Sequence, residues 1–131
     1  MQVCPCGRQG AKGRPLAFTH CCQPWLGGGI APDAECLMRS RYSAYVLGDV
    51  AYLLSSWHPS TRPAEIELGP DTRWLGLQVR LHRQLDASHA EVEFVARLRV
   101  GGRGAHRLHE ISSFVRENER WFYVDGVSLG G

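Results

Sequence analysis

EVEFVARLRV, residues 91–100, is the stretch from which the fold can be inferred, because apolar side chains occupy every second position. These positions are Val92, Phe94, Ala96, Leu98 and Val100. The residues between them are mostly charged: Glu91, Glu93, Arg97 and Arg99, with Val95 as the exception. Successive side chains of a strand point to opposite faces, so the alternation predicts a β-strand with one buried face.

The sequence on both sides of this strand predicts further antiparallel strands. Gly101–Gly104 indicates a turn that leads to a partner strand at residues 106–116. Glu117–Glu119 indicates a second turn, followed by a last strand at residues 120–128. Upstream, the pattern changes to a strand-like period from Arg73 onward. The C-terminal half is therefore expected to form a meander.

Helices are predicted before these strands. Asp33 can cap a helix that runs to about Leu47 and ends at Gly48. Asp49 can cap a second helix, which Pro59 ends. Its apolar stripe consists of Val50, Leu53, Leu54 and Trp57. Helices followed by antiparallel strands predict an α+β fold.

Composition and charge exclude several classes of protein. The 131 residues suit one compact domain with at most a small appendage, and 44% hydrophobic against 21% charged residues is ordinary globular usage. A net charge of only +2 gives no strong field for nucleic acid, which argues against a nucleic-acid partner. No stretch reaches the length of a membrane span, and the N-terminus does not resemble a signal peptide. We therefore expect a cytoplasmic protein with no membrane association.

Four of the five cysteines lie within residues 4–22, as the pairs Cys4/Cys6 and Cys21/Cys22. Disulfides are rare in a reducing cytoplasm, and both pairs would close strained rings. Two short pairs of thiolates are instead the ligand set of a structural zinc. Gly7 directly follows a ligand and can adopt a positive φ that turns its amide toward sulfur.

Two alternatives to this ligand set stay open. His20 is adjacent to Cys21 and could replace one thiolate as a zinc ligand. The cysteines could also be four buried free thiols. Residues 1–30 contain too few large apolar side chains to fold without a cross-link or a bound metal. This favours a metal site over four free thiols.

The sequence resembles two known families at these positions. The C-P-C-G opening and C-C closing resemble the SEC-C motif, a small zinc-binding element also found at the C-terminus of the SecA translocase. Residues 31–60, WLGL at 74–77 and RWFYVDG at 120–126 resemble the YchJ family of uncharacterised bacterial proteins. The most specific part of the match is LMRSRYSAY, residues 37–45.

The resemblance implies a SEC-C-like zinc-binding segment at residues 1–30 and a nuclear transport factor 2-like (NTF2-like) domain at residues 31–131. In that domain helices pack into a curved antiparallel sheet to form a cone. The loop at residues 7–20 is longer than the usual family form and lacks its lysine-rich pattern. Because the chain has no second SEC-C motif after the last strand, the resemblance implies one zinc per chain.

Polar residues that point into the cone are the candidates for a binding site. Helical spacing places Arg39 and Arg41 on different stripes, so at most one of them should face the cavity fully. We expect one of these arginines to lie within ion-pair reach of Glu110 or Asp125. The remaining candidates around the pair are Tyr45, Trp57, His58 and Trp121. An ion pair that satisfies both charges would indicate a structural role, whereas an unpaired member facing a cavity would indicate a ligand.

Three classes of function follow from these features. The first is a non-enzymatic adaptor that uses the zinc knuckle to dock a protein partner. The second is a small-molecule enzyme of isomerase or hydratase type, with His58, Glu110 or Asp125 as acid and base. The third is RNA or ribosome association through basic residues near the N-terminus. The negative charge of a zinc ion with four thiolates would offset most of the positive charge of these residues. Cone-shaped domains often pair through the open sheet face, so a homodimer is compatible with the fold.

Overall fold

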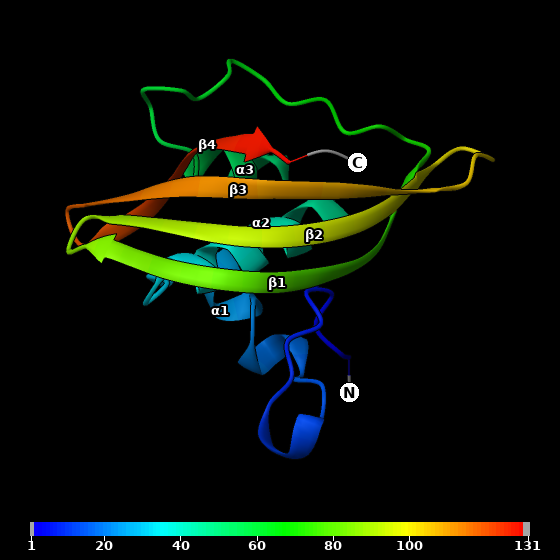
Figure 1. The fold of residues 1–131 in the computed structure, drawn as a ribbon, viewed down its shortest axis with the longest axis horizontal. Helices are drawn as coiled ribbons and strands as arrows, with labels where there is room; N and C mark the ends of the chain where they lie inside the picture. The colour runs from blue at the N-terminus through cyan, green and yellow to red at the C-terminus, as the bar shows by residue number, and fades with distance from the viewer. Residues whose placement is uncertain (1, 130–131) are drawn as a thin grey trace.

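A four-stranded antiparallel meander in the order β1-β2-β3-β4 forms one side of the protein, and the helices lie on its other side (Figure 1). The computed structural model describes residues 2–129. The strands are β1 (Thr72–Asp86), β2 (His89–Val100), β3 (Ala105–Glu117) and β4 (Arg120–Ser128). The helical elements are η1 (Ala11–Gly13), η2 (Phe18–His20), α1 (Gln23–Leu26), α2 (Ala34–Leu47) and α3 (Val50–Ser55).

The two main helices begin and end where the sequence predicts. The carboxylate of Asp33 accepts a 2.8 Å hydrogen bond from the Cys36 amide at the start of α2. Gly48 ends α2 with a φ of 77°, a left-handed conformation that glycine adopts without strain. Asp49 caps α3 through the amide of Tyr52 at 3.0 Å. The last helical residue of α3 is Ser55, so α3 ends before the position at which Pro59 would stop it.

Burial along strand β2 confirms the predicted alternation, with one exception on each face. Val92, Phe94 and Ala96 are buried on the face that packs against the helices. Val100, predicted to be buried, lies at the end of β2 and is 42% exposed. Val95 on the opposite face is only 3% exposed, although its cross-strand partners are the polar residues Gln78 of β1 and His109 of β3.

The core is one continuous cluster that joins the N-terminal segment to the sheet. It contains Cys4, Cys6 and Cys22 together with Leu37 and Tyr42 of α2 and inner residues of the strands. Three register shifts in β1 let that strand bend. The predicted α+β class is confirmed. Within residues 2–129, no helix is long and apolar enough to cross a membrane.

Loss of the Asp33 cap should destabilise α2. We expect Asp33→Ala to lower the free energy of unfolding by about 1 kcal/mol, the usual cost of removing an N-cap acceptor. Urea denaturation followed by circular dichroism measures this change. Asp71→Ala is the matched control, because the Asp71 side chain is exposed and forms no hydrogen bond within residues 2–129. Equal stability of the two variants would contradict the capping role.

Candidate functional site

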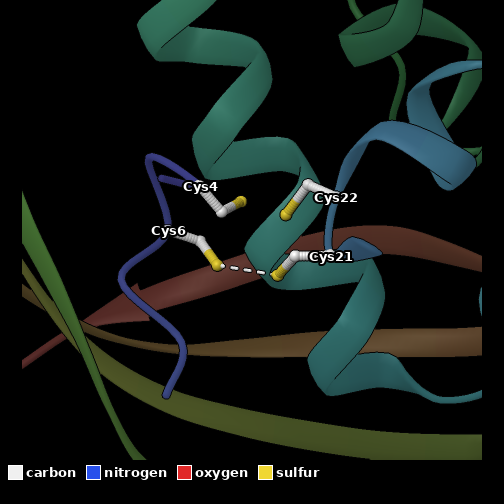
Figure 2. A group of neighbouring side chains, drawn as sticks. All are labelled: Cys4, Cys6, Cys21 and Cys22. Carbon is white, nitrogen blue, oxygen red and sulfur yellow. Dashed lines mark hydrogen bonds between the residues drawn. The ribbon is translucent and has the colours of Figure 1, made fainter. Parts of the chain in front are cut away.

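The four N-terminal cysteines come together beside α2 (Figure 2). Cys4 and Cys6 lie in the first turn of the chain, and Cys21 and Cys22 lie between η2 and α1. All four sulfur atoms lie within 4.8 Å of one another, and the sulfur atoms of Cys6 and Cys21 are 3.5 Å apart. The sequence therefore predicted a real spatial cluster.

The cluster has the dimensions of a metal site. Four thiolates at about 2.3 Å from a tetrahedral metal ion stand about 3.8 Å apart, which is close to the observed spacing. Burial, followed by the charge of Cys6, raises the pKa of Cys21 to about 12. The pKa of Cys4 is shifted the other way, because hydrogen bonds with Cys22 and Cys6 favour its thiolate. The thiols that keep their protons must release them when a metal ion binds. The four cysteines can hold a metal ion.

Arginine side chains surround the cluster. Arg39 donates from Nη1 to the carbonyl oxygen of Cys6 at 3.3 Å, and the same nitrogen lies 3.9 Å from the Cys6 sulfur. Its Nε donates to Glu35 at 2.8 Å. Arg8 lies 3.9 Å from the same carboxylate and donates to the sulfur of Cys36 at 3.3 Å. The two arginines and Glu35 together carry a net charge of about +1, beside a site where four thiolates on a divalent metal would leave about −2.

Two details of the predicted knuckle can now be placed. Gly7 has a φ of 74°, as predicted, but its amide donates to the carbonyl oxygen of Cys4 at 3.2 Å rather than to a sulfur. His20 is exposed and is not among the residues whose ligand atoms cluster. The structure therefore favours four thiolates over the ligand set with His20.

A cavity of about 240 Å³ lies on the other side of α2, between this helix and the inner face of the sheet. Its lining is mainly apolar and aromatic. The residues are Met38, Arg41, Tyr42 and Tyr45 of α2, Trp57, Trp74 of β1, Phe94 and Ala96 of β2, Leu108, Glu110, Ser112 and Phe114 of β3, and Tyr123 of β4.

Arg41 is the most deeply buried charge in this cavity, with 6% of its surface exposed. Its Nη1 donates to the carbonyl oxygen of Leu53 at 2.8 Å and to the hydroxyl of Ser56 at 2.6 Å. Its guanidinium carbon lies 5.0 Å from the ring centroid of Trp57 and 4.4 Å from that of Tyr123. Burial lowers the pKa of Arg41, but a guanidinium remains charged at neutral pH.

Glu110 supplies the negative charge of the cavity. Its carboxylate accepts a 2.9 Å hydrogen bond from the Ser112 hydroxyl. It lies over Gly126, where a Cβ atom would overlap it. Burial, followed by the charge of Glu110, raises the pKa of Tyr123 to about 12, so this phenol is protonated at neutral pH. The cavity therefore combines a buried cation, a carboxylate and a neutral phenol with an apolar wall.

The prediction of an ion pair between an α2 arginine and Glu110 or Asp125 is wrong. Within residues 2–129 no nitrogen of Arg41 lies within the 4.0 Å ion-pair limit of a carboxylate. Arg39 faces the cysteine cluster and pairs with Glu35. The helical spacing correctly predicted that only one arginine would face the cavity, and that one is Arg41.

Three other predicted pocket residues lie elsewhere. Asp125 is exposed, because a β-bulge at Val124 shifts the register between Ser113 and Phe114 and turns Asp125 to the outer face. The imidazole of His58 packs on Phe122 and lies 3.0 Å from Glu117, outside the cavity lining. Trp121 is buried in the core beyond the cavity.

Of the eight predicted pocket residues, the structure brings together Arg41, Tyr45, Trp57 and Glu110. Sequence reasoning missed two contributors from the same helix face, Met38 and Tyr42. Their spacing to Tyr45 is the i, i+4, i+7 pattern of one helical stripe, so the signal was present. Trp74 carried no comparable signal, because Trp74 and Leu75 are adjacent apolar residues and the sequence does not show which of them faces the helices.

Comparison with known proteins agrees with this architecture. The model of the YchJ middle NTF2-like domain matches residues 33–126. A UPF0225 protein of Polaromonas naphthalenivorans is 62% identical over 130 residues, covering 94% of this chain and 95% of the relative. A UPF0225 protein of Bordetella parapertussis is 56% identical over 128 residues, covering 95% and 91%.

A solved structure extends the similarity to the N-terminal segment. It is the solution structure of a SEC-C motif containing protein from Rhodopseudomonas palustris, with a TM-score of 0.83 and 31% sequence identity. The alignment covers 99% of this chain and 100% of the other. The chain therefore belongs to the YchJ family of UPF0225 proteins.

Proposed function

We propose that this protein binds a small molecule in the cavity between α2 and the sheet. The observation that carries the proposal is that Arg41 and Glu110 share this cavity without pairing with each other. A structural pair would satisfy both charges directly, because unpaired buried charges are costly. Two charges left apart in a cavity are instead available to a ligand.

The size of the cavity supports the same proposal. A dry apolar cavity of about 150 Å³ is large enough to bind benzene. The cavity of about 240 Å³ can therefore hold a ring with a short side chain. Small apolar pockets with a few convergent polar groups are the usual form of a small-molecule site.

Binding is better supported than isomerase or hydratase chemistry. That chemistry needs an acid and a base within hydrogen-bond reach of one substrate. Of the three candidates for these roles, His58 and Asp125 lie outside the cavity lining, which leaves Glu110. Tyr123, with its raised pKa, is a hydrogen-bond donor rather than a base at neutral pH.

We also infer that the four cysteines bind one zinc ion per chain and that its role is structural. A closed set of four thiolates leaves no open position for a substrate, as in structural zinc sites. The bound zinc would hold the N-terminal segment against α2, the helix that also presents Arg41.

Docking of a protein partner through the knuckle is a second candidate function. The loop between the cysteine pairs projects from the body of the protein (Figure 1), and its residues 11–15 are exposed. Hydrogen bonds between the Gly10 amide and the Arg14 carbonyl, and between the Leu16 amide and the Arg8 carbonyl, order it as a hairpin. Lys12→Ser/Arg14→Ser should weaken such docking without changing metal content or ligand binding in the cavity.

Filling the cavity should abolish binding of small molecules. We expect Leu108→Trp to lose the hits that the wild type gives in a ligand-observed NMR fragment screen, because the larger side chain occupies the cavity. Val127→Trp is the control, since Val127 is an exposed strand residue outside the lining. Retention of every hit by Leu108→Trp would place the binding surface elsewhere.

Neutralising Glu110 should affect binding more than stability. We expect Glu110→Gln to change the free energy of unfolding by less than about 1 kcal/mol, because a glutamine can still accept the Ser112 hydrogen bond. Loss of one member of a structural buried pair costs roughly 3–5 kcal/mol instead. Thermal melting of wild type and variant distinguishes these values. A large fall in the midpoint would assign Glu110 to the core.

Removal of one cysteine ligand should release zinc. We expect one zinc per wild-type chain and loss of stoichiometric zinc in Cys6→Ser, measured by inductively coupled plasma mass spectrometry of the purified protein. Cys36→Ser is the matched control, because Cys36 lies nearby but outside the cluster and should keep its zinc. Stoichiometric zinc of unchanged affinity in Cys6→Ser would contradict the assignment.

Chelation of zinc should loosen one part of the protein. A structural zinc contributes on the order of 10 kcal/mol to local folding. We expect a chelator to raise hydrogen exchange in residues 2–28 and in the first turns of α2, which contact the cysteines, while β2 and β3 stay protected. Loss of protection throughout the sheet would show that the metal supports the whole fold.

A further inference from the structure

We infer that the ligand of this cavity is a small monocarboxylate with an apolar, ring-sized body, bound through the Nε and Nη2 edge of Arg41. This inference rests on the proposed function and specifies the class of ligand. The class of ligand follows from the hydrogen bonds that Arg41 makes and from the donors of Arg41 that have no partner.

One edge of Arg41 is already used by the fold. Both side-chain hydrogen bonds of Arg41 within residues 2–129 start at Nη1, one to the carbonyl oxygen of Leu53 and one to the hydroxyl of Ser56. Within residues 2–129, Nε and Nη2 have no hydrogen-bond partner. These two nitrogens form the edge with which arginine grips a carboxylate through two parallel hydrogen bonds.

The free edge is held in a fixed position. The rings of Trp57 and Tyr123 lie close to the guanidinium, and the two bonds from Nη1 attach it to the C-terminal end of α3. The carbonyl and hydroxyl that accept those bonds carry only partial negative charge, so they offset part of the buried positive charge. A preorganised donor edge loses little conformational entropy when a ligand binds.

The rest of the cavity specifies the body of the ligand. Met38, Phe94 and Phe114 give it an apolar wall, and Trp74 adds an aromatic face. Glu110 would repel a second anionic group and can accept a hydrogen bond from a neutral donor on the ligand. One carboxylate on an apolar body therefore matches the charge of Arg41 and places no second anionic group near Glu110.

A cationic ligand fits the contacts less well. Glu110 already accepts the Ser112 hydroxyl and is only partly buried, so its charge is better satisfied than that of Arg41. A cation would also be repelled by the more deeply buried guanidinium. The two charges are thus unequally satisfied, and Arg41 is the one that lacks hydrogen-bond partners.

Four probes of nearly equal shape test the inference with the full chain loaded with zinc. They are 3-phenylpropanoate, 3-phenylpropanamide, 3-phenylpropan-1-ol and 3-phenylpropylamine. We expect 3-phenylpropanoate to bind about 10- to 100-fold more tightly than the amide and the alcohol, the usual gain from charge-assisted hydrogen bonds. Isothermal titration calorimetry measures the dissociation constants, and Leu108→Trp should abolish binding of all four.

Two variants assign any preference to Arg41. Arg41→Lys keeps the charge but loses the bidentate edge, so the preference for carboxylate over amide should shrink about tenfold or more. Because Arg41→Lys also loses contacts in the core, its circular dichroism spectrum and melting are recorded alongside. If it does not fold, Ser56→Ala replaces it, because this variant removes one of the two hydrogen bonds that fix the guanidinium. Ser56→Ala should weaken binding of 3-phenylpropanoate more than binding of the amide, and an equal effect on both would contradict the role of Arg41.

The possible results distinguish an error in the class of ligand from an error in the proposed binding site. Equal binding of the carboxylate, amide and alcohol that is lost in Leu108→Trp would overturn the anion inference and leave the cavity as a binding site. Tighter binding of the amine would also overturn it. Failure of all four probes to bind would overturn both the ring-sized carboxylate class and its assignment to Arg41, whereas the fragment screen tests the cavity itself.

Discussion

The packing of helix α2 between the cysteine cluster and the sheet is the constraint on which the rest of the structure depends. One stripe of the helix, with Glu35, Arg39 and Ser43, faces the cysteines. A neighbouring stripe carries Arg41 and Tyr45 into the cavity. Because one rigid element carries both sets of residues, a metal that fixes the N-terminal segment also fixes the wall of the cavity.

The two arginines of this helix have different physical roles for the same reason. Arg39 lies beside thiols and a carboxylate, so its charge is compensated within the protein. Arg41 is buried against aromatic rings and helix-end acceptors, with one edge unused. A buried charge that is only partly compensated, next to a cavity, is costly for a fold that has no use for it. The proposed function and the class of ligand both follow from this difference.

The sequence predicted the helices, the strands and the cysteine cluster because their signals are local. Alternation predicted the strands, Asp33 and Asp49 predicted the helix starts, and cysteine spacing predicted the cluster. The errors depend on tertiary structure. Alternation along β4 assumes an unbroken pleat, and the bulge at Val124 reverses the faces beyond it. Helical spacing separated the two arginines, but the side on which the cysteines pack could not be read from the chain.

Native mass spectrometry of protein purified from cells without denaturation tests the central claim most directly, because metal and retained ligand both appear as added mass. We expect one zinc ion on nearly every chain and, on a fraction of chains, a further small-molecule mass that is absent from Leu108→Trp. Zinc alone on the wild type, even after incubation with a cell metabolite extract, would contradict a small-molecule site in the cavity. A retained mass unchanged in Leu108→Trp would contradict its location.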